Sequence, residues 1–403
     1  MEGSKIPSGD GEEGWSSSMP NRRLTGANMA SIISNAVVDF SLGVYKLSAV
    51  GGENLFMSPS SVYAVMAMIQ AGAGAATLEQ MTAALKLTGH NRKTQLQLLK
   101  EFNTAMMAGS RDVILTTANK LYPNADRKVV EEYIKVLSES FKSEITPMAF
   151  STKPEECRKE INDWVEKQTN KKIKDVLPDG SITSQTGMVV VNAIYFKGEW
   201  ADKFEPRSTT KTDFHPSASS KVQVDMMKER MDYAKYGESK EMKCKVLQLP
   251  YQGKEIGMVL FLPHEVEGLS KLEQALTREH LEKILAESKS ETVDVYLPKF
   301  KMETQLTLKE TLQKLGMVDL FNMAKADLSG IGEQLFVSEV YHKAFVAVDE
   351  NGTEAAAATA AIMLLGCMIP NRVMEFKADH PFMFMIWDYR IRVPLFIGRV
   401  IQP

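Results

Sequence analysis

The chain has 403 residues, 44% of them hydrophobic and 25% charged, which is the composition of an ordinary globular protein with a substantial core. A formal net charge of -3 gives no reason to expect nucleic acid as a partner, and no run of 18 apolar residues predicts a membrane span. Length alone allows two or three domains. No linker interrupts the sequence after residue 26, so we interpret residues 27–403 as a single domain.

The N-terminus and the cysteines bear on location. Residues 1–26 are rich in Gly, Ser, Glu and Arg and lack the apolar core of a secretory signal, so we interpret them as a disordered tail. Cys157, Cys244 and Cys367 are odd in number and far apart, which does not suggest a disulfide framework. Both features favour a cytoplasmic protein, with unconventional secretion as an alternative. No His or Cys spacing is typical of a metal site, so no metal or cofactor is predicted.

The first half of the chain contains most of the predicted helices. Apolar residues from Ile33 to Leu47 recur at spacings of three and four, which predicts an amphipathic helix. Ser58 and Pro59 are typical of the first turn of a second helix, which ends towards Gly72. A strand is predicted over 117–122, and further helices over 129–141 and 155–169.

The second half contains most of the predicted strands. Met188 to Phe196 is mostly apolar, which is typical of a strand buried on both faces, and Asn192 within it needs a hydrogen-bond partner. One more helix is predicted over 306–316. Helices gathered early and strands gathered late favour an α+β fold. The other predicted strands lie at 258–262, 292–297, 344–348, 382–387 and 395–400.

The segment from Glu350 to Pro370 is typical of neither a loop nor a helix. Between Thr353 and Ile369 it contains one Gly and no Pro, and its four consecutive alanines lack an apolar helical stripe. Its small residues instead alternate, so that in a strand they would share one face. Such a segment can enter the middle of a sheet, because it avoids proline, bulk and charge on that face. The alternating residues are Thr353, Ala355, Ala357, Thr359 and Ala361.

Eight motifs, in order from about residue 28 to Pro403, resemble the serpin family. Each motif alone is weak evidence, but the ordered set is specific. The lack of a signal and the Ala-rich segment are most similar to intracellular clade-B serpins and to arthropod, tick-like serpins. The motifs are N-L-F-M-S-P-S-S at 54–61, V-N-A-I-Y-F-K-G-E-W at 191–200, L-P-K-F at 297–300, A-D-L-S-G-I at 326–331, Y-H-K-A-F at 341–345, D-E-N-G-T-E-A-A-A-A-T at 349–359, A-D-H-P-F at 378–382 and P-L-F-I-G-R-V at 394–400.

The resemblance implies a fold of three β-sheets and eight or nine helices with an exposed, insertable reactive-centre loop. It implies a monomeric protease inhibitor and not an enzyme. A target endopeptidase would attack the loop, form an acyl-enzyme and be trapped when the cleaved loop enters a sheet. The alternative is a non-inhibitory binding, carrier or chaperone protein. The hinge and loop would span about 350–377, with hinge residues Glu350, Gly352, Thr353, Ala355, Ala356, Ala357, Ala358 and Thr359.

The reactive bond follows from the family's usual spacing. Counting Glu350 as the first position places the bond between Gly366 and Cys367, with Leu365 and Met368 as neighbouring alternatives. Glycine is unusual there, because it offers nothing to a primary specificity pocket. No Lys or Arg lies between residues 351 and 371, which argues against trypsin-like targets. The apolar residues Leu364, Leu365, Met368 and Ile369 favour chymotrypsin-like or elastase-like serine proteases, or papain-like cysteine proteases.

The resemblance also implies a polar network that controls strand separation where the sheet opens. Taken alone, a His or Trp in such a set is more often ordinary core. Three basic residues, Arg92, Lys93 and Lys100, additionally suggest a glycosaminoglycan as an alternative partner. The residues of the sheet-opening region are Asn54, Ser58, Pro59, Ser61, Asn192, Trp200 and His342.

Overall fold

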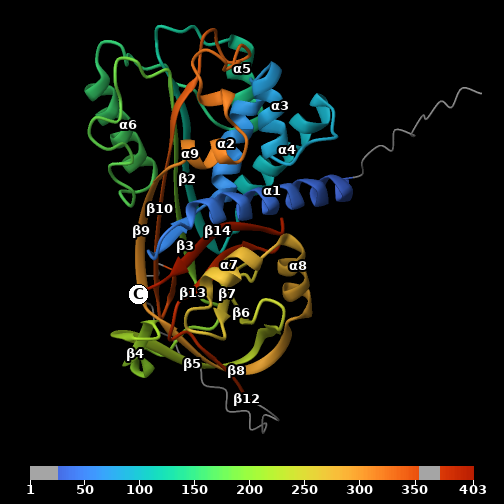
Figure 1. Cartoon of the computed structure of the whole chain (residues 1–403), viewed down its shortest axis with the longest axis vertical. Helices are drawn as coiled ribbons and strands as arrows, with labels where there is room; N and C mark the ends of the chain where they lie inside the picture. Colours follow the sequence, from blue (N-terminus) through green and yellow to red (C-terminus); the bar gives the residue numbers. More distant parts are fainter. Residues whose placement is uncertain (1–25, 354–372) are drawn as a thin grey trace, which may run out of the picture.

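The computed structural model describes residues 26–353 and 373–403 (Figure 1). The predicted tail up to residue 25, the hinge beyond Thr353 and the predicted reactive bond at Gly366–Cys367 lie outside the described residues. Nine α-helices lie within these two ranges, in agreement with the predicted eight or nine. They are α1 (Gly26–Ser48), α2 (Pro59–Ala71), α3 (Ala75–Ala84), α4 (Arg92–Ala108), α5 (Glu131–Val136), α6 (Pro154–Gln168), α7 (Leu269–Ala275), α8 (Arg278–Glu287) and α9 (Lys309–Lys314).

The described residues form fourteen strands, which confirms the predicted α+β class. Seven of the strands are predicted from the sequence, with ends that differ by at most seven residues. The strands are β1 (Leu55–Met57), β2 (Val113–Pro123), β3 (Met188–Glu199), β4 (Thr210–Ser217), β5 (Ser220–Ser239), β6 (Cys244–Pro250), β7 (Ile256–Pro263), β8 (Lys289–Pro298), β9 (Phe300–Thr307), β10 (Val337–Asp349), β11 (Gly352–Thr353), β12 (Val373–Lys377), β13 (Phe382–Asp388) and β14 (Val393–Val400).

Hydrogen bonds join these strands into two continuously paired sets, called the first and second ladder below. One has the order β2-β3-β11-β10-β9, and the other has the order β1-β14-β13-β7-β6-β5-β8-β12, with β4 also paired to β5. The 20-residue strand β5 runs through the second ladder, and its pairing with β8 shifts register between Met231 and Ala234. At this irregularity the ladder divides into a sheet around β6, β7, β13 and β14 and a sheet around β4, β8 and β12. The fold therefore has the three predicted sheets.

The five-stranded sheet is covered on both faces, by α2 and its neighbours on one side and by α6 on the other (Figure 1). Within β3, Val190 and Ile194 belong to the main core, whereas Val191 packs in a smaller cluster with Ile161 and Val165 of α6. Each of these five residues is at most 1% exposed. This confirms that 188–196 is a strand buried on both faces, so any added strand in this sheet must fit between two packed layers.

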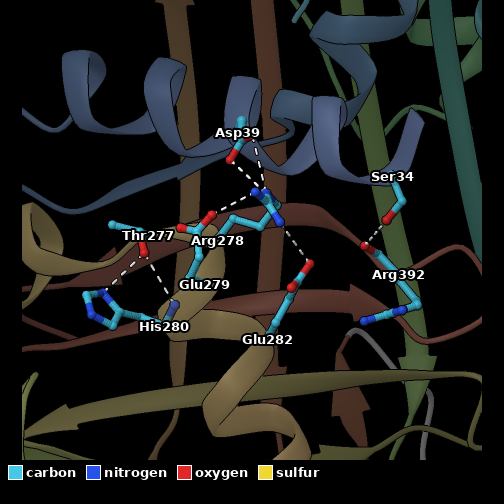
Figure 2. Close-up of polar contacts among 8 residues, drawn as sticks. All are labelled: Ser34, Asp39, Thr277, Arg278, Glu279, His280, Glu282 and Arg392. Carbon is cyan, nitrogen blue, oxygen red and sulfur yellow. Dashed lines mark hydrogen bonds and ion pairs between the residues drawn. The ribbon is translucent and has the colours of Figure 1, made fainter. Parts of the chain in front are cut away.

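Helix α1 shows the predicted amphipathic pattern, with Val37, Phe40 and Val44 fully buried. By length and composition it is also a candidate membrane span, but in this fold its apolar face is part of the core. Figure 2 shows how the helix is tied to α8, since the Arg278 guanidinium pairs with Asp39 at 3.2 Å. These contacts fix α1 across the sheet built from β13 and β14.

Two predicted helices differ from the structure. The first three residues of the range 306–316 are not helical, because β9 continues to Thr307 and its backbone pairs with β10, leaving only Lys309–Lys314 as α9. The range 129–141 divides into α5 and a π-helical turn over Leu137–Phe141. The apolar residue Ile134 in this range is 47% exposed. At residues 306 and 307, the hydrogen bonds between β9 and β10 outweigh the local helical pattern.

Candidate functional site

A buried polar network connects the N-terminus of α2 to the five-stranded sheet. Ser58 caps α2 as predicted, with its hydroxyl accepting from the Ser61 N–H, and Pro59 occupies the first turn. The Ser58 backbone N–H donates to His342 Nε2 at 3.1 Å, and His342 Nδ1 lies 2.5 Å from Asn192 Oδ1. Because Nε2 accepts, Nδ1 carries the proton, and the imidazole is the neutral tautomer.

The network continues from β3 to β2. Asn192 Nδ2 donates to Ser61 Oγ at 2.6 Å and to Asn119 Oδ1 at 2.5 Å, which supplies the partners that the sequence analysis required. Asn119 lies directly opposite Asn192 in the β2–β3 pairing and was not among the predicted residues. The network thus links β2, β3 and β10, and β3 and β10 are the two strands that must separate if another strand is to enter.

The electrostatics of the network depend on His342. Burial lowers the pKa of His342 to about 3, and the hydrogen bond with Asn192 opposes this effect only in part. A low dielectric surrounding disfavours the imidazolium. The network is therefore built around a neutral histidine, and protonation would remove the acceptor for the Ser58 N–H.

The described part of the hinge forms a short strand inside the sheet. After Asp349 the chain turns and returns as β11, where Thr353 lies opposite Val348 of β10 and Gly198 of β3. Thr353 is fully buried, and its Oγ1 lies 2.7 Å from the Tyr251 hydroxyl. The side chain of Thr353 therefore faces the interior of the protein. The alanines that would follow it lie outside the described residues.

Gly352 is required by the close approach of β11 to β3. Its φ is +149°, in a region that residues with a side chain rarely adopt. A Cβ at this position would lie 2.2 Å from the carbonyl oxygen of Gly198 and 2.7 Å from Glu199 Cα. Both neighbours are backbone atoms, so only glycine allows the chain to enter the sheet here.

Trp200 and Tyr251 form the wall beside β11. Their rings stack with centroids 4.7 Å apart, and Trp200 Nε1 donates to the Asp349 carbonyl at 3.0 Å. Trp200 therefore lies beside the turn that leads into β11. Tyr251 was not predicted, since an isolated tyrosine after a strand carries no sequence signal for this contact.

An ion pair holds the turn before β11. Glu350 pairs with Lys299 at 2.9 Å and accepts from the Thr209 hydroxyl at 2.8 Å. Burial raises the pKa of Glu350, but hydrogen bonds, chiefly from Lys299, outweigh burial and leave its pKa below the ordinary value. Glu350 is therefore a carboxylate at neutral pH and attaches the start of the hinge to the sheet that contains β8.

Two predicted features lie apart from these groups. Asn54 does not join the network, because its side chain bonds the C-terminal residues, accepting from the Ile401 N–H and donating to the Gln402 carbonyl, both at 2.6 Å. The Arg92 guanidinium donates to the carbonyls of Gln70 and Ala71 at 2.7 Å, so it caps the end of α2. This use of Arg92 weakens the case for a glycosaminoglycan site on α4.

The polar network and β11 lie along the same two strands, β3 and β10. Strands β3 and β10 pair directly and in parallel from the Met188–Val337 pair to the Tyr195–Phe345 pair. At the C-terminal ends of both strands, β11 lies between them and pairs with each. Residues 35–403 match the family model described as serpin (serine protease inhibitor). The chain belongs to the serpin family.

Comparison with known serpins supports this assignment along nearly the whole chain. Serpin B4 of Homo sapiens is 38% identical over 372 residues, which cover 87% of this chain and 94% of the relative. Iris of the tick Ixodes ricinus is 38% identical over 380 residues, or 92% and 99%. The crystal structure of Serpin48 from the insect Tenebrio molitor matches with a TM-score of 0.82 and 34% identity, covering 93% of this serpin and 98% of Serpin48. The predicted serpin fold, the similarity to clade-B and tick serpins, and protease inhibition are thereby confirmed.

Breaking the Glu350–Lys299 pair is expected to loosen the hinge of this serpin. Lys299→Met and Glu350→Gln should each lower the melting temperature, because each leaves a partly buried polar partner without its counterpart. In a double-mutant cycle the coupling should be about 1 kcal/mol, or roughly 1 °C in melting temperature. Differential scanning calorimetry at one scan rate measures it.

The pair Lys271–Glu265 provides the matched control, since its side chains are 80% and 59% exposed. Removing Lys271 should leave the melting temperature unchanged, as for most exposed ion pairs. Equal effects of the two pairs would contradict a specific role for Glu350–Lys299 at the hinge.

Proposed function

We propose that this serpin is a suicide-substrate inhibitor of chymotrypsin-like or elastase-like serine endopeptidases, and that it also traps papain-like cysteine endopeptidases. The observation that carries the proposal is β11, where Thr353 occupies a strand position between β3 and β10. A chain that has entered the sheet by two residues needs only to continue in the same direction. Small side chains follow at alternate positions, as continued entry requires.

The proposed reaction begins as ordinary proteolysis. The protease nucleophile adds to the carbonyl carbon before the scissile bond, the C–N bond breaks, and the new amine leaves with a proton. The protease stays bound as an acyl-enzyme on the N-terminal arm. That arm then extends β11 between β3 and β10 towards the N-terminal ends of these two strands. The protease is trapped if this insertion is faster than hydrolysis of the acyl-enzyme.

The dimensions of the slot support this proposal. The 13 residues from Glu354 to Gly366 would add roughly 43 Å of strand at about 3.3 Å per residue. The strands that would flank them, β3 and β10, contain 12 and 13 residues, and β11 already lies opposite the last two of each. The arm up to the predicted bond is therefore two or three residues longer than the remaining slot, and its insertion would carry the bound protease to the far end of the sheet.

The proposal is tested by mixing the protein with chymotrypsin, elastase, papain and trypsin and running a denaturing gel. We expect a denaturant-resistant adduct with chymotrypsin or elastase, lasting loss of their activity, and no adduct with trypsin. Sequencing the released C-terminal peptide identifies the bond. Clean cleavage by every protease with full activity remaining would instead favour a non-inhibitory binding, carrier or chaperone protein.

We further propose that the protein acts in the cytoplasm. Cys157 and Cys244 are free and buried, and thiols that remain unpaired suit a reducing compartment. Fractionation of cells that express the untagged chain tests this location. Recovery mainly from the medium of intact cells would favour unconventional secretion instead.

A further inference from the structure

An aromatic contact crosses the line along which β3 and β10 would separate. The rings of Tyr195 on β3 and Phe345 on β10 lie with their centroids 6.4 Å apart and their planes tilted by 35°. Both residues belong to the smaller core cluster on the α6 side of the sheet, and they are 4% and 8% exposed. The polar network of Asn192 and His342 lies on the opposite side, towards α2. We call Tyr195 and Phe345 the aromatic pair.

The aromatic pair lies at the end of the β3–β10 pairing that is next to β11. Tyr195 and Phe345 are the last directly paired residues of these two strands before β11 comes between them. A strand that extends β11 in the same register reaches them three residues after Thr353. They are therefore the first paired residues of β3 and β10 that an entering strand separates.

Strand entry cannot leave this aromatic contact in place. Neighbouring strands lie about 4.8 Å apart, so one added strand moves β3 and β10 to roughly twice that separation. Rings whose centroids are now 6.4 Å apart would then lie beyond the limit of about 7 Å for aromatic contacts. The contact is therefore lost before the new strand has completed its hydrogen bonds, so it contributes to the barrier to entry.

A second neighbour of the Tyr195 ring is also connected to β10. Lys172, in the segment that follows α6, places its Nζ 5.8 Å from the centroid of the Tyr195 ring. Two residues further on, the Lys174 carbonyl accepts a hydrogen bond from Lys343 Nζ of β10 at 2.7 Å. The Tyr195 ring thus lies against Phe345 and Lys172, and both are linked to β10. Separation of β3 from β10 acts on both contacts at once.

We propose that Tyr195 and Phe345 are positioning residues that set the rate at which a strand enters between β3 and β10. The aromatic pair holds the two strands together at the entry end, on the face opposite the polar network. The consequence for inhibition rests on the proposed function. A weaker pair speeds insertion and increases the share of protease that is trapped, and it also makes the native protein less stable.

Strand entry is measured on the full chain without any protease, by adding a synthetic peptide with the sequence of residues 354–366 and following the appearance of a species with a raised melting temperature. Phe345→Leu removes the ring but keeps an apolar side chain. Loss of an aromatic contact should speed entry of the peptide by roughly threefold to tenfold. Phe345→Tyr, which keeps the ring, should show the native rate. Equal rates for Phe345→Leu and the native protein, including no entry into either, would overturn the proposal.

Phe102→Leu is the matched control for a general loss of stability. Phe102 on α4 is 3% exposed, and its ring contacts that of Tyr63 on α2 with centroids 5.3 Å apart. Neither residue belongs to β3 or β10. We expect Phe102→Leu to lower the melting temperature and to leave the rate of peptide entry unchanged. If Phe102→Leu speeds entry as much as Phe345→Leu does, stability alone sets the rate and the proposal is wrong.

A double-mutant cycle tests whether the two rings act through one contact. Tyr195→Leu should also speed peptide entry. The double variant with Tyr195→Leu and Phe345→Leu should be no faster than the faster of the two single variants, because the contact can be lost only once. Effects that multiply would show two independent packing contributions and would contradict the aromatic pair.

Lys172→Met covers the case in which the core variants do not fold. Lys172 is exposed, so its replacement leaves the core unchanged. Removing the cation beside the Tyr195 ring should speed peptide entry by about twofold to fivefold. Lys171→Met, at the neighbouring exposed residue, should not. Equal rates for these two variants would overturn the role of the Tyr195 ring. Because no protease is present, failure of the proposed inhibition would not alter any of these results.

Discussion

Replacing Thr353 by arginine is expected to convert this serpin from an inhibitor into a substrate of chymotrypsin or elastase. Thr353 is fully buried between β3 and β10, with its hydroxyl against Tyr251. An arginine there would bury a charge beside the Trp200–Tyr251 stack, at a cost of several kcal/mol. The variant is therefore expected to hold this part of the hinge outside the sheet, so that insertion after cleavage has to bury the charge. If the barrier to insertion rises by that amount, insertion slows by at least about 100-fold, and deacylation occurs first.

The measurements are the fraction of protease in the denaturant-resistant adduct and the melting temperature of the cleaved protein. We expect the adduct to fall at least tenfold in Thr353→Arg, and cleavage to raise the melting temperature of the native protein but not of the variant. Thr353→Ser, which keeps the hydroxyl, should form adduct normally. Thr210→Arg is the control, because Thr210 is exposed on β4. Full adduct formation by Thr353→Arg would show that trapping does not depend on a small, uncharged side chain at this position.

The parts of the fold that the sequence predicts best are those with strong local patterns. The spacing in α1, the Ser58-Pro59 start of α2 and the apolar run of β3 each give an element close to the observed one. Strand β5, by contrast, was not predicted, because polar and apolar residues share a strand that runs through two sheets and changes register. The residues 306 and 307 joined β9 because pairing with β10 outweighed their helical pattern.

The candidate site also contains residues with a local sequence signal and residues without one. Ser58, Ser61, Asn192 and His342 do form one network, but Asn119 was missed, because a single Asn in the alternating segment T-T-A-N-K-L-Y carries no local signal. It becomes visible only from its register opposite Asn192. Tyr251, Lys299 and Thr209 contact the hinge from three separate elements, so their roles depend on the tertiary structure and not on spacing.

Acidification from pH 7.5 to pH 4.5 is expected to destabilise the protein through His342. Its folded pKa of about 3 lies below the ordinary value of 6.5, so between these values the unfolded chain binds more protons than the native protein. The contribution of His342 is therefore fully present above pH 6.5 and is lost as the pH falls towards 3. At pH 4.5 the loss is about 3 kcal/mol, or roughly 3 °C in melting temperature.

A variant without the imidazole isolates this effect from that of the carboxylates. His342→Gln cannot titrate but keeps a donor and an acceptor for Asn192 and Ser58, so its melting temperature should fall by roughly 3 °C less than that of the native protein over the same pH range. His264→Gln, at an exposed position, should retain the full dependence. Identical pH dependence in all three proteins would mean that His342 is not held neutral. Because His342 joins β10 to β3 through Asn192, the stability lost at pH 4.5 is that of a contact between these two strands, which links the pH dependence of the network to the opening of the sheet.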